Sequence, residues 1–179
     1  MTSVAALSLA DRATAAGLAV RAAAAWPELP EDGPPPALPG FVESSFSPLV
    51  AAVAERCLRR AYDEPPVPAE PAEHTAVVLL SRLGDVTTAV RLAEAVDAGT
   101  RVAPLLFFQA VPNAVAGYVA GRWGLGGPVV CLGCAEEGLD VVRLLLDDGD
   151  AKAALVVLIE QSTVDSAVAV LVTDEGVPL

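Results

Sequence analysis

Two cysteines close together, Cys131 and Cys134, are the residues of this chain best suited to chemistry. Their C-x-x-C spacing occurs in redox-active pairs, in which one thiol lies at a helix N-terminus and has a lowered pKa. A metal site would need more ligands than Cys57 and the single histidine, His74, can add. We therefore interpret the cysteines as small thiols packed in the core, and we expect neither a metal nor a cofactor.

Other chemical patterns are incomplete. The glycines of residues 121–127 lack the spacing of a dinucleotide-binding fingerprint, and no phosphate-loop lysine follows them. Glu136 and Glu137 are neighbours on an expected helix, so their side chains face different directions and do not form a carboxylate dyad. In the first turn, their negative charges are expected to interact favourably with the helix dipole. The serines have no G-x-S-x-G context, which excludes the usual nucleophile elbow.

Composition narrows the function classes. The chain has 179 residues, 54% of them hydrophobic, and a net charge of −12, which repels nucleic acids and anionic membrane surfaces. No apolar run reaches the roughly 18 residues of a membrane span, and Asp11 and Arg12 interrupt the N-terminus where a signal peptide would be apolar. We therefore expect a cytoplasmic protein. The chain has three cysteines, and an odd number argues against a disulfide framework.

The elements that would position these residues alternate between helix and strand. Four apolar runs predict buried strands, at residues 75–80, 128–133, 153–159 and 167–172. Helices are predicted at residues 8–26, from Ser45 past Leu58, at 85–98, from Pro112 to about 123, and at 135–146. The pattern predicts one α/β domain over residues 1–179, with a single mixed sheet of about five strands.

Three remaining segments are predicted to lack regular structure: two proline-rich connectors at residues 27–39 and 65–71, and an irregular stretch at 103–111. The sheet should be flanked by helices on both faces. Its predicted core consists of apolar strand residues: Val77, Val78, Leu79, Val129, Leu132, Leu155, Val157 and Leu158.

One long segment carries a family resemblance: VAPLLFFQAVPNAVAGYVAGRWGLGGPVVCLGCAEEGLDVVRLLL, residues 102–146. It resembles the N-terminal half of the β-ketoacyl synthases, in which a PNxxAG helix, a GP turn and a strand precede the helix that carries the nucleophilic cysteine. The segments FSPLVAAVAERCLR and AVVLLSRLGDV look like the corresponding elements of short chain-length-factor-type subunits of aryl polyene and type II polyketide pathways. The resemblance implies a layered α/β/α fold, the first half of the thiolase-like ketosynthase fold.

Departures from the family pattern affect the catalytic residues. The family cysteine lies three residues before a glycine, and here that count from Gly138 reaches Ala135, so Cys134 is one position early. An offset of one residue on a helix turns a side chain by about 100°. The family also uses two histidines from the second half of its fold, and His74 lies in the first half. The resemblance therefore implies a noncatalytic subunit.

The resemblance also implies partners and site residues. The chain would dimerise with itself or with a catalytic ketosynthase, in polyketide or fatty-acyl biosynthesis. The implied dimer interface consists of Asn113, Ala116, Gly117, Tyr118, Val119, Val130 and Leu132. Phe107, Phe108 and Ala135 would line the substrate tunnel. An acyl carrier protein would dock mainly on the partner, because Arg56, Arg59 and Arg60 are interpreted as a solvated helix end rather than a carrier site.

Two other functions remain open. An enzyme alternative uses Cys134 as an acyl-accepting thiol in a small acyltransferase or thioesterase, which would need a base within hydrogen-bond reach. A third interpretation is a scaffold without a partner.

Overall fold

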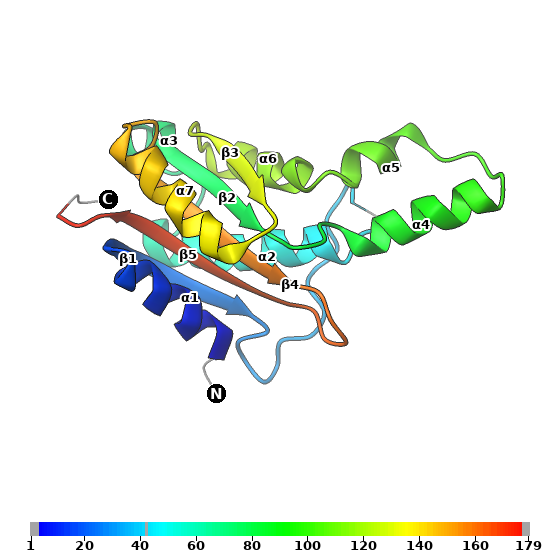
Figure 1. Cartoon of the computed structure of the whole chain (residues 1–179), viewed down its shortest axis with the longest axis horizontal. Coiled ribbons are helices and arrows are strands. Elements are labelled where there is room, and N and C mark those ends of the chain that lie inside the picture. Colours follow the sequence, from blue (N-terminus) through cyan, green and yellow to red (C-terminus); the bar gives the residue numbers. More distant parts are fainter. Residues whose placement is uncertain (1–3, 42, 177–179) are drawn as a thin grey trace.

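Five strands form one mixed sheet in the order β1-β5-β4-β2-β3 (Figure 1). The structure is a computed structural model that describes residues 4–41 and 43–176. The strands are β1 (Leu18–Trp26), β2 (Thr75–Leu80), β3 (Val129–Leu132), β4 (Ala153–Glu160) and β5 (Ser166–Asp174). Strand β2 is parallel to both β3 and β4, whereas β5 is antiparallel to β4 and β1. The predicted pairing of residues 75–80 with 153–159 is confirmed.

Helices cover both faces of the sheet, which confirms the predicted α/β/α layers. Helices α2 (Phe46–Tyr62) and α6 (Pro112–Trp123) pack on one face, where Val77 and Leu79 of β2 point. Helices α1 (Val4–Ala15) and α7 (Ala135–Asp147) pack on the other face, where Val78 and Leu80 point. Successive side chains of β2 therefore point alternately into two cores, one on each face of the sheet. This explains why the strand is apolar at nearly every position. None of the described helices is long and apolar enough to cross a membrane.

The remaining helices are α3 (Ala69–Glu73), α4 (Val86–Asp97) and α5 (Pro104–Gln109). Helix α3 overlaps the second predicted connector. Helices α4 and α5 form an arm that projects away from the sheet (Figure 1). The arm begins at Gly84, whose φ of +67° favours glycine, and the side chain of Asp85 then accepts a hydrogen bond from Thr88 N to cap α4.

The prediction of one helix over residues 8–26 is wrong in its second half. Helix α1 ends before Gly17, whose φ is +76°, and residues 18–26 form β1. The alanines of this segment favour a helix by propensity, but pairing with β5 along the whole length of β1 supplies hydrogen bonds and burial that outweigh it. With β1 added to the four strands predicted from apolar runs, the sheet has the five strands that were expected.

Residues 103–111 are also more regular than predicted. Pro104 occupies the first turn of α5, in the same way that Pro112 opens α6. Five predicted core residues are buried: Val77, Val78, Leu79, Leu155 and Val157. Leu132 and Leu158 are half-buried, and Val129 is 36% exposed because β3 is an edge strand.

Candidate functional site

A cleft of about 470 Å³ opens beside the carboxyl ends of β2 and β4 and contains Cys134. Cys134 follows β3 and is the N-cap residue of α7, with extended backbone angles rather than helical ones. Its neighbours in the cleft are Leu80, Ser81, Arg82, Leu83, Gly133 and residues 158–162. In open α/β sheets, ligands commonly bind beside the carboxyl ends of the strands. The thiol of Cys134 also lies at a helix N-terminus, as the sequence suggested.

His74 lies at the other end of the sheet. It follows α3 and precedes β2, and its carbonyl oxygen accepts hydrogen bonds from Lys152 N and Ala153 N at the start of β4. The chain's single histidine is therefore separated from Cys134 by the length of the strands. A thiol nucleophile needs a base within hydrogen-bond reach, and this histidine cannot serve as that base.

Cys131, the first cysteine of the C-x-x-C pair, does not have the lowered pKa of a redox-active thiol. Cys131 lies on β3, and burial raises the pKa of its thiol to about 11. Cys57 lies on the buried side of α2, and burial raises the pKa of its thiol to about 12. Reactive cysteines have lowered pKa values, so these two thiols stay protonated. Among the described residues, no group of three or more His, Cys, Asp or Glu side chains is placed to hold a metal ion.

Replacing Cys134 by alanine is expected to leave partner association unchanged, and incubation with an acyl thioester should add no mass to the wild-type chain. The reason is that the cleft brings no histidine to the thiol. Intact-mass spectrometry of the wild type and of Cys134→Ala measures both. Stoichiometric acylation that disappears in Cys134→Ala would contradict this expectation and support the acyltransferase alternative.

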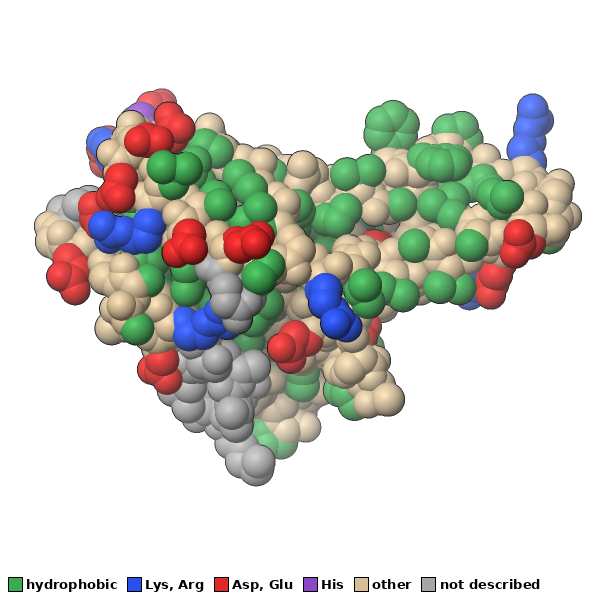
Figure 2. All heavy atoms as spheres, viewed as in Figure 1, with side chains coloured by type: hydrophobic (Ala, Val, Ile, Leu, Met, Phe, Trp, Pro, Cys, Tyr) green, Lys and Arg blue, Asp and Glu red, His purple; other side chains and the backbone are tan. Residues whose placement is uncertain are grey.

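The second candidate region is an apolar surface that covers the arm. We call it the arm surface and define it by exposed apolar side chains: Val90, Val96, Leu105, Phe107, Phe108 and Val111. Phe107 is 59% exposed and Phe108 is 73% exposed. Outside the arm surface, Leu83, Tyr118 and Val129 are also exposed, and the Tyr118 ring packs edge-on against Phe41. Figure 2 shows hydrophobic side chains along the arm. Exposed apolar patches of this kind mark binding surfaces.

The predicted interface residues on α6 divide into two groups. Asn113, Gly117 and Tyr118 are exposed. Ala116 and Val119 are buried in the chain's own core, so the isolated chain covers their side chains, and their contact with a partner stays a prediction. The helix turns these two side chains toward α2 and β2, together with Val115 and Trp123. On β3, Val130 and Leu132 are half-buried and pack against the core on the α7 side.

Strand β3 leaves one edge of the sheet open among the described residues. Val77 N donates to Pro128 O, and Ser81 N donates to Leu132 O. In a parallel ladder the intervening residues direct their main-chain groups to the other side, so the N–H and C=O of Val129 and Cys131 point away from β2. These groups are available to another strand.

Of the three predicted tunnel residues, the structure describes the side chains of Phe107 and Phe108. Phe107 and Phe108 lie on the arm, and neither lines the Cys134 cleft. The side chain of Ala135 lies outside the described part of the structure. Sequence analysis missed that the two phenylalanines are exposed. The apolar run LLFF after Pro104 could have predicted this exposure. A short helix with four consecutive large apolar residues has apolar side chains on every side, and it cannot bury all of them against one core.

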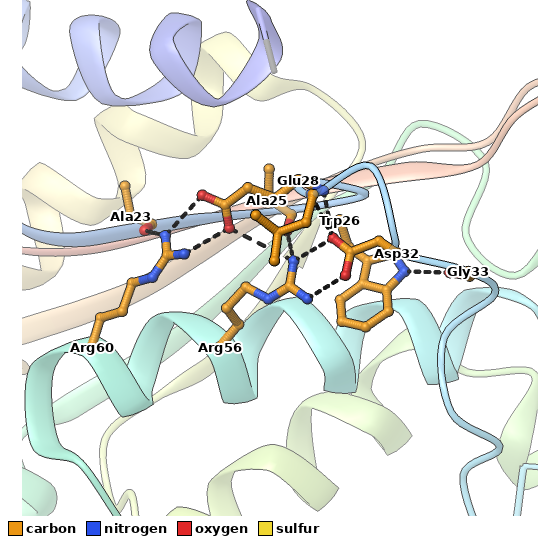
Figure 3. A network of polar contacts seen from close by, with 9 residues as sticks. Ala23, Ala25, Trp26, Glu28, Asp32, Gly33, Arg56 and Arg60 are labelled. Atoms are coloured by element: carbon orange, nitrogen blue, oxygen red, sulfur yellow. Dashed lines mark hydrogen bonds and ion pairs between the residues drawn. The ribbon is translucent and has the colours of Figure 1, made fainter. Parts of the chain in front are cut away.

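The three arginines near the end of α2 are held in ion pairs, and Figure 3 shows those of Arg56 and Arg60. Arg56 forms a paired contact with Asp32, with N–O distances of 2.8 Å, and Arg60 contacts Glu28 at 2.7 Å. Arg59 pairs with Glu55 one turn earlier on the same helix. Because carboxylates neutralise all three, they do not form a free cationic patch.

The sequence of residues 44–177 matches the family model described as "Beta-ketoacyl synthase, N-terminal domain". The chain belongs to this ketosynthase family. The match spans the chain from the start of α2 to beyond β5, so it includes the Cys134 cleft, the arm and the β3 edge. No curated protein matches this ketosynthase-family chain in sequence.

Solved structures show the same fold. A chain of the ketosynthase (ApeO) in complex with its chain length factor (ApeC) from Xenorhabdus doucetiae superposes with a TM-score of 0.66 at 18% identity, over 88% of this chain and 79% of that one. The ishigamide ketosynthase/chain length factor gives 0.66 at 17% identity, over 84% and 50%. A β-ketoacyl synthase from Burkholderia phymatum gives 0.65 at 14%, over 92% and 54%. The chain thus spans about half the length of the last two structures.

Proposed function

We propose that this chain is a noncatalytic, chain-length-factor-type subunit that associates with a catalytic ketosynthase in polyketide or fatty-acyl biosynthesis. Two of the structures with the same fold are described as a ketosynthase together with a chain length factor, and this supports a heterodimer over a self-dimer. The position of His74, at the far end of the sheet from Cys134, supports the absence of catalysis.

The observation that carries the proposal is the arm surface. Six of the twelve large hydrophobic side chains that are exposed in the described structure belong to the arm surface. Leaving this much apolar area in water is unfavourable by about 25 cal/mol for each Å². A partner that covers the arm and the adjacent β3 edge removes this cost, and clustered exposure on one region favours one partner surface over scattered contacts.

The proposed seam runs along the open edge of β3. A partner strand would bond to the outward main-chain groups of Val129 and Cys131 and continue the sheet across the interface. An aspartate at Val130 does not test this seam cleanly, because Val130 packs against the chain's own core and the charge would also destabilise the monomer.

Val129→Pro tests the seam more selectively. Proline removes an N–H that points away from β2, so the monomer should remain folded while the association with the candidate ketosynthase partner weakens by at least about tenfold. Sedimentation of the mixed proteins measures the change, and thermal unfolding confirms the monomer. Arg59→Glu, on the far helix α2, is the control that should leave the complex intact. An unchanged complex in Val129→Pro would show that β3 is not the seam.

Acyl carrier protein is proposed to dock on the catalytic partner. Carrier proteins of this kind are acidic, and this chain has a net charge of −12. The arginine cluster on α2 that could have offset this charge is engaged by Asp32, Glu28 and Glu55. The remaining surface would repel an acidic carrier within the Debye length of about 8 Å at physiological salt.

A further inference from the structure

A separate pocket of about 930 Å³ lies between the segment that connects β1 to α2 and the turn that connects β4 to β5. Its walls are largely apolar and include Trp26, Leu38, Phe41, Leu49 and five prolines at positions 27, 34, 35, 39 and 48. Its volume falls in the range of small-molecule pockets, about 300–1,000 Å³. The pocket is not part of the Cys134 cleft, with which it shares only Ser162.

The connecting segment that forms one wall is long, and its described residues, 27–41 and 43–45, contain no helix or strand. Loops of this length in a compact domain usually have a function. Prolines suit a wall of this kind, because they have no N–H that a ligand or water must satisfy. Most of this wall precedes residue 44, where the match to the ketosynthase family begins, so the pocket is built largely from residues outside that match.

Ion pairs and hydrogen bonds hold the wall in place (Figure 3). The Asp32 carboxylate accepts hydrogen bonds from the Arg56 guanidinium and from the backbone N–H groups of Glu28 and Leu29. The Arg56 guanidinium also lies 4.1 Å from the Trp26 ring centroid, and Trp26 Nε1 donates to Gly33 O. The hydrogen bonds from Arg56 hold the pKa of Asp32 well below its usual range, so this carboxylate stays ionised at physiological pH.

The charges in the walls determine which ligands fit. Asp32 and Asp165 line the pocket, and the pocket lining includes no lysine or arginine. Asp165 accepts hydrogen bonds from Ser45 Oγ and Ser162 N, so its carboxylate is engaged within the chain. The lining offers an anionic ligand no free cation, because Arg56 beside the pocket is already engaged by Asp32. An uncharged apolar ligand would instead bury its surface against proline and aromatic rings.

We propose that this pocket binds a neutral, hydrocarbon-rich small molecule. The proposal goes beyond the partner function, because the pocket shares no residue with the arm surface or with β3. The ligand is recognised by shape and by contact with the rings of Trp26 and Phe41, and a largely apolar wall without a free cation discriminates against fatty-acid anions. A long-chain alcohol has the required chemistry.

Two fluorescent probes that differ only in charge test the proposal on the full chain. N-phenyl-1-naphthylamine is neutral, and its 8-sulfonate has the same rings with one negative charge. We expect the neutral probe to bind at least about tenfold more tightly, and 1-dodecanol but not dodecanoate to displace it. Ala37→Glu adds a carboxylate at an exposed wall position and should weaken binding of the neutral probe by about tenfold or more.

Two further variants locate the bound probe. Ala98→Glu makes the same charge change at the end of α4, far from the pocket, and should leave the affinity unchanged. Phe108→Asp reports binding to the arm surface and should also leave it unchanged. Equal binding of the two probes, or an affinity insensitive to Ala37→Glu, overturns the proposal. Loss of binding in Phe108→Asp alone overturns it as well, because the probe would then occupy the arm.

Discussion

Replacing Gly127 by alanine is expected to lower the free energy of unfolding by about 3 kcal/mol and the Tm by about 10 °C. A Cβ at this position would lie 2.5 Å from the carbonyl carbon of Thr75 and 2.7 Å from Ala76 N. Both atoms belong to the backbone of β2, a strand paired on both sides, so they cannot move aside as a flexible side chain would. Strand β3 would have to separate from β2, and the β3 edge would be lost with it.

Thermal and urea unfolding of the purified variant measure the effect, and Gly121→Ala is the matched control. Gly121 lies on α6 with no atom within 4 Å of a Cβ, so alanine there should stabilise the helix by up to about 1 kcal/mol. Wild-type stability in Gly127→Ala would mean that the approach of residues 126–128 to β2 is looser than the structure shows.

The double variant Phe107→Asp/Phe108→Asp is expected to weaken association with the ketosynthase partner by more than about a hundredfold. Aromatic side chains in the centre of an interface contribute most of its binding energy, and aspartates in their place would be buried without counter-ions. The isolated chain should keep its stability within about 0.5 kcal/mol, because both rings are exposed on α5.

Leu144→Asp is the control for this variant. Leu144 is an exposed leucine on α7, outside the arm surface, and the same change in polarity there should leave the complex intact. Analytical ultracentrifugation of each variant mixed with the partner separates the two cases. If the double variant binds as the wild type does, the arm is not the interface, and its exposed rings need another explanation.

The strands were the most predictable part of this fold. Residues 75–80 and 153–159 are short runs that are rich in valine and apolar at nearly every position, which is typical of a strand buried on both faces. Strand β1 was missed because LAVRAAAAW is rich in alanine, which favours a helix locally, whereas its strand conformation depends on β5, which follows more than 100 residues later. Local propensity cannot contain that information.

The candidate site was predictable in its position along the chain but not in the direction of its side chains. The sequence placed Cys134 at the start of a helix, and the structure makes it the N-cap residue. On α6, small residues occupy both the inner and the outer face, so the sequence did not separate buried Ala116 from exposed Gly117. The phase of that helix is set by its contacts with α2 and β2, and only the folded chain shows which face remains for a partner.

Native mass spectrometry of the chain co-expressed with a candidate ketosynthase from the same genome, after incubation with an acyl thioester, tests the central claim most directly. The account predicts a one-to-one complex in which the acyl group adds mass to the ketosynthase alone. It also predicts that the complex dissociates when Phe107 and Phe108 are replaced by aspartate. Two proteins that remain separate, or an acyl group on Cys134 of this chain, would contradict a noncatalytic partner subunit.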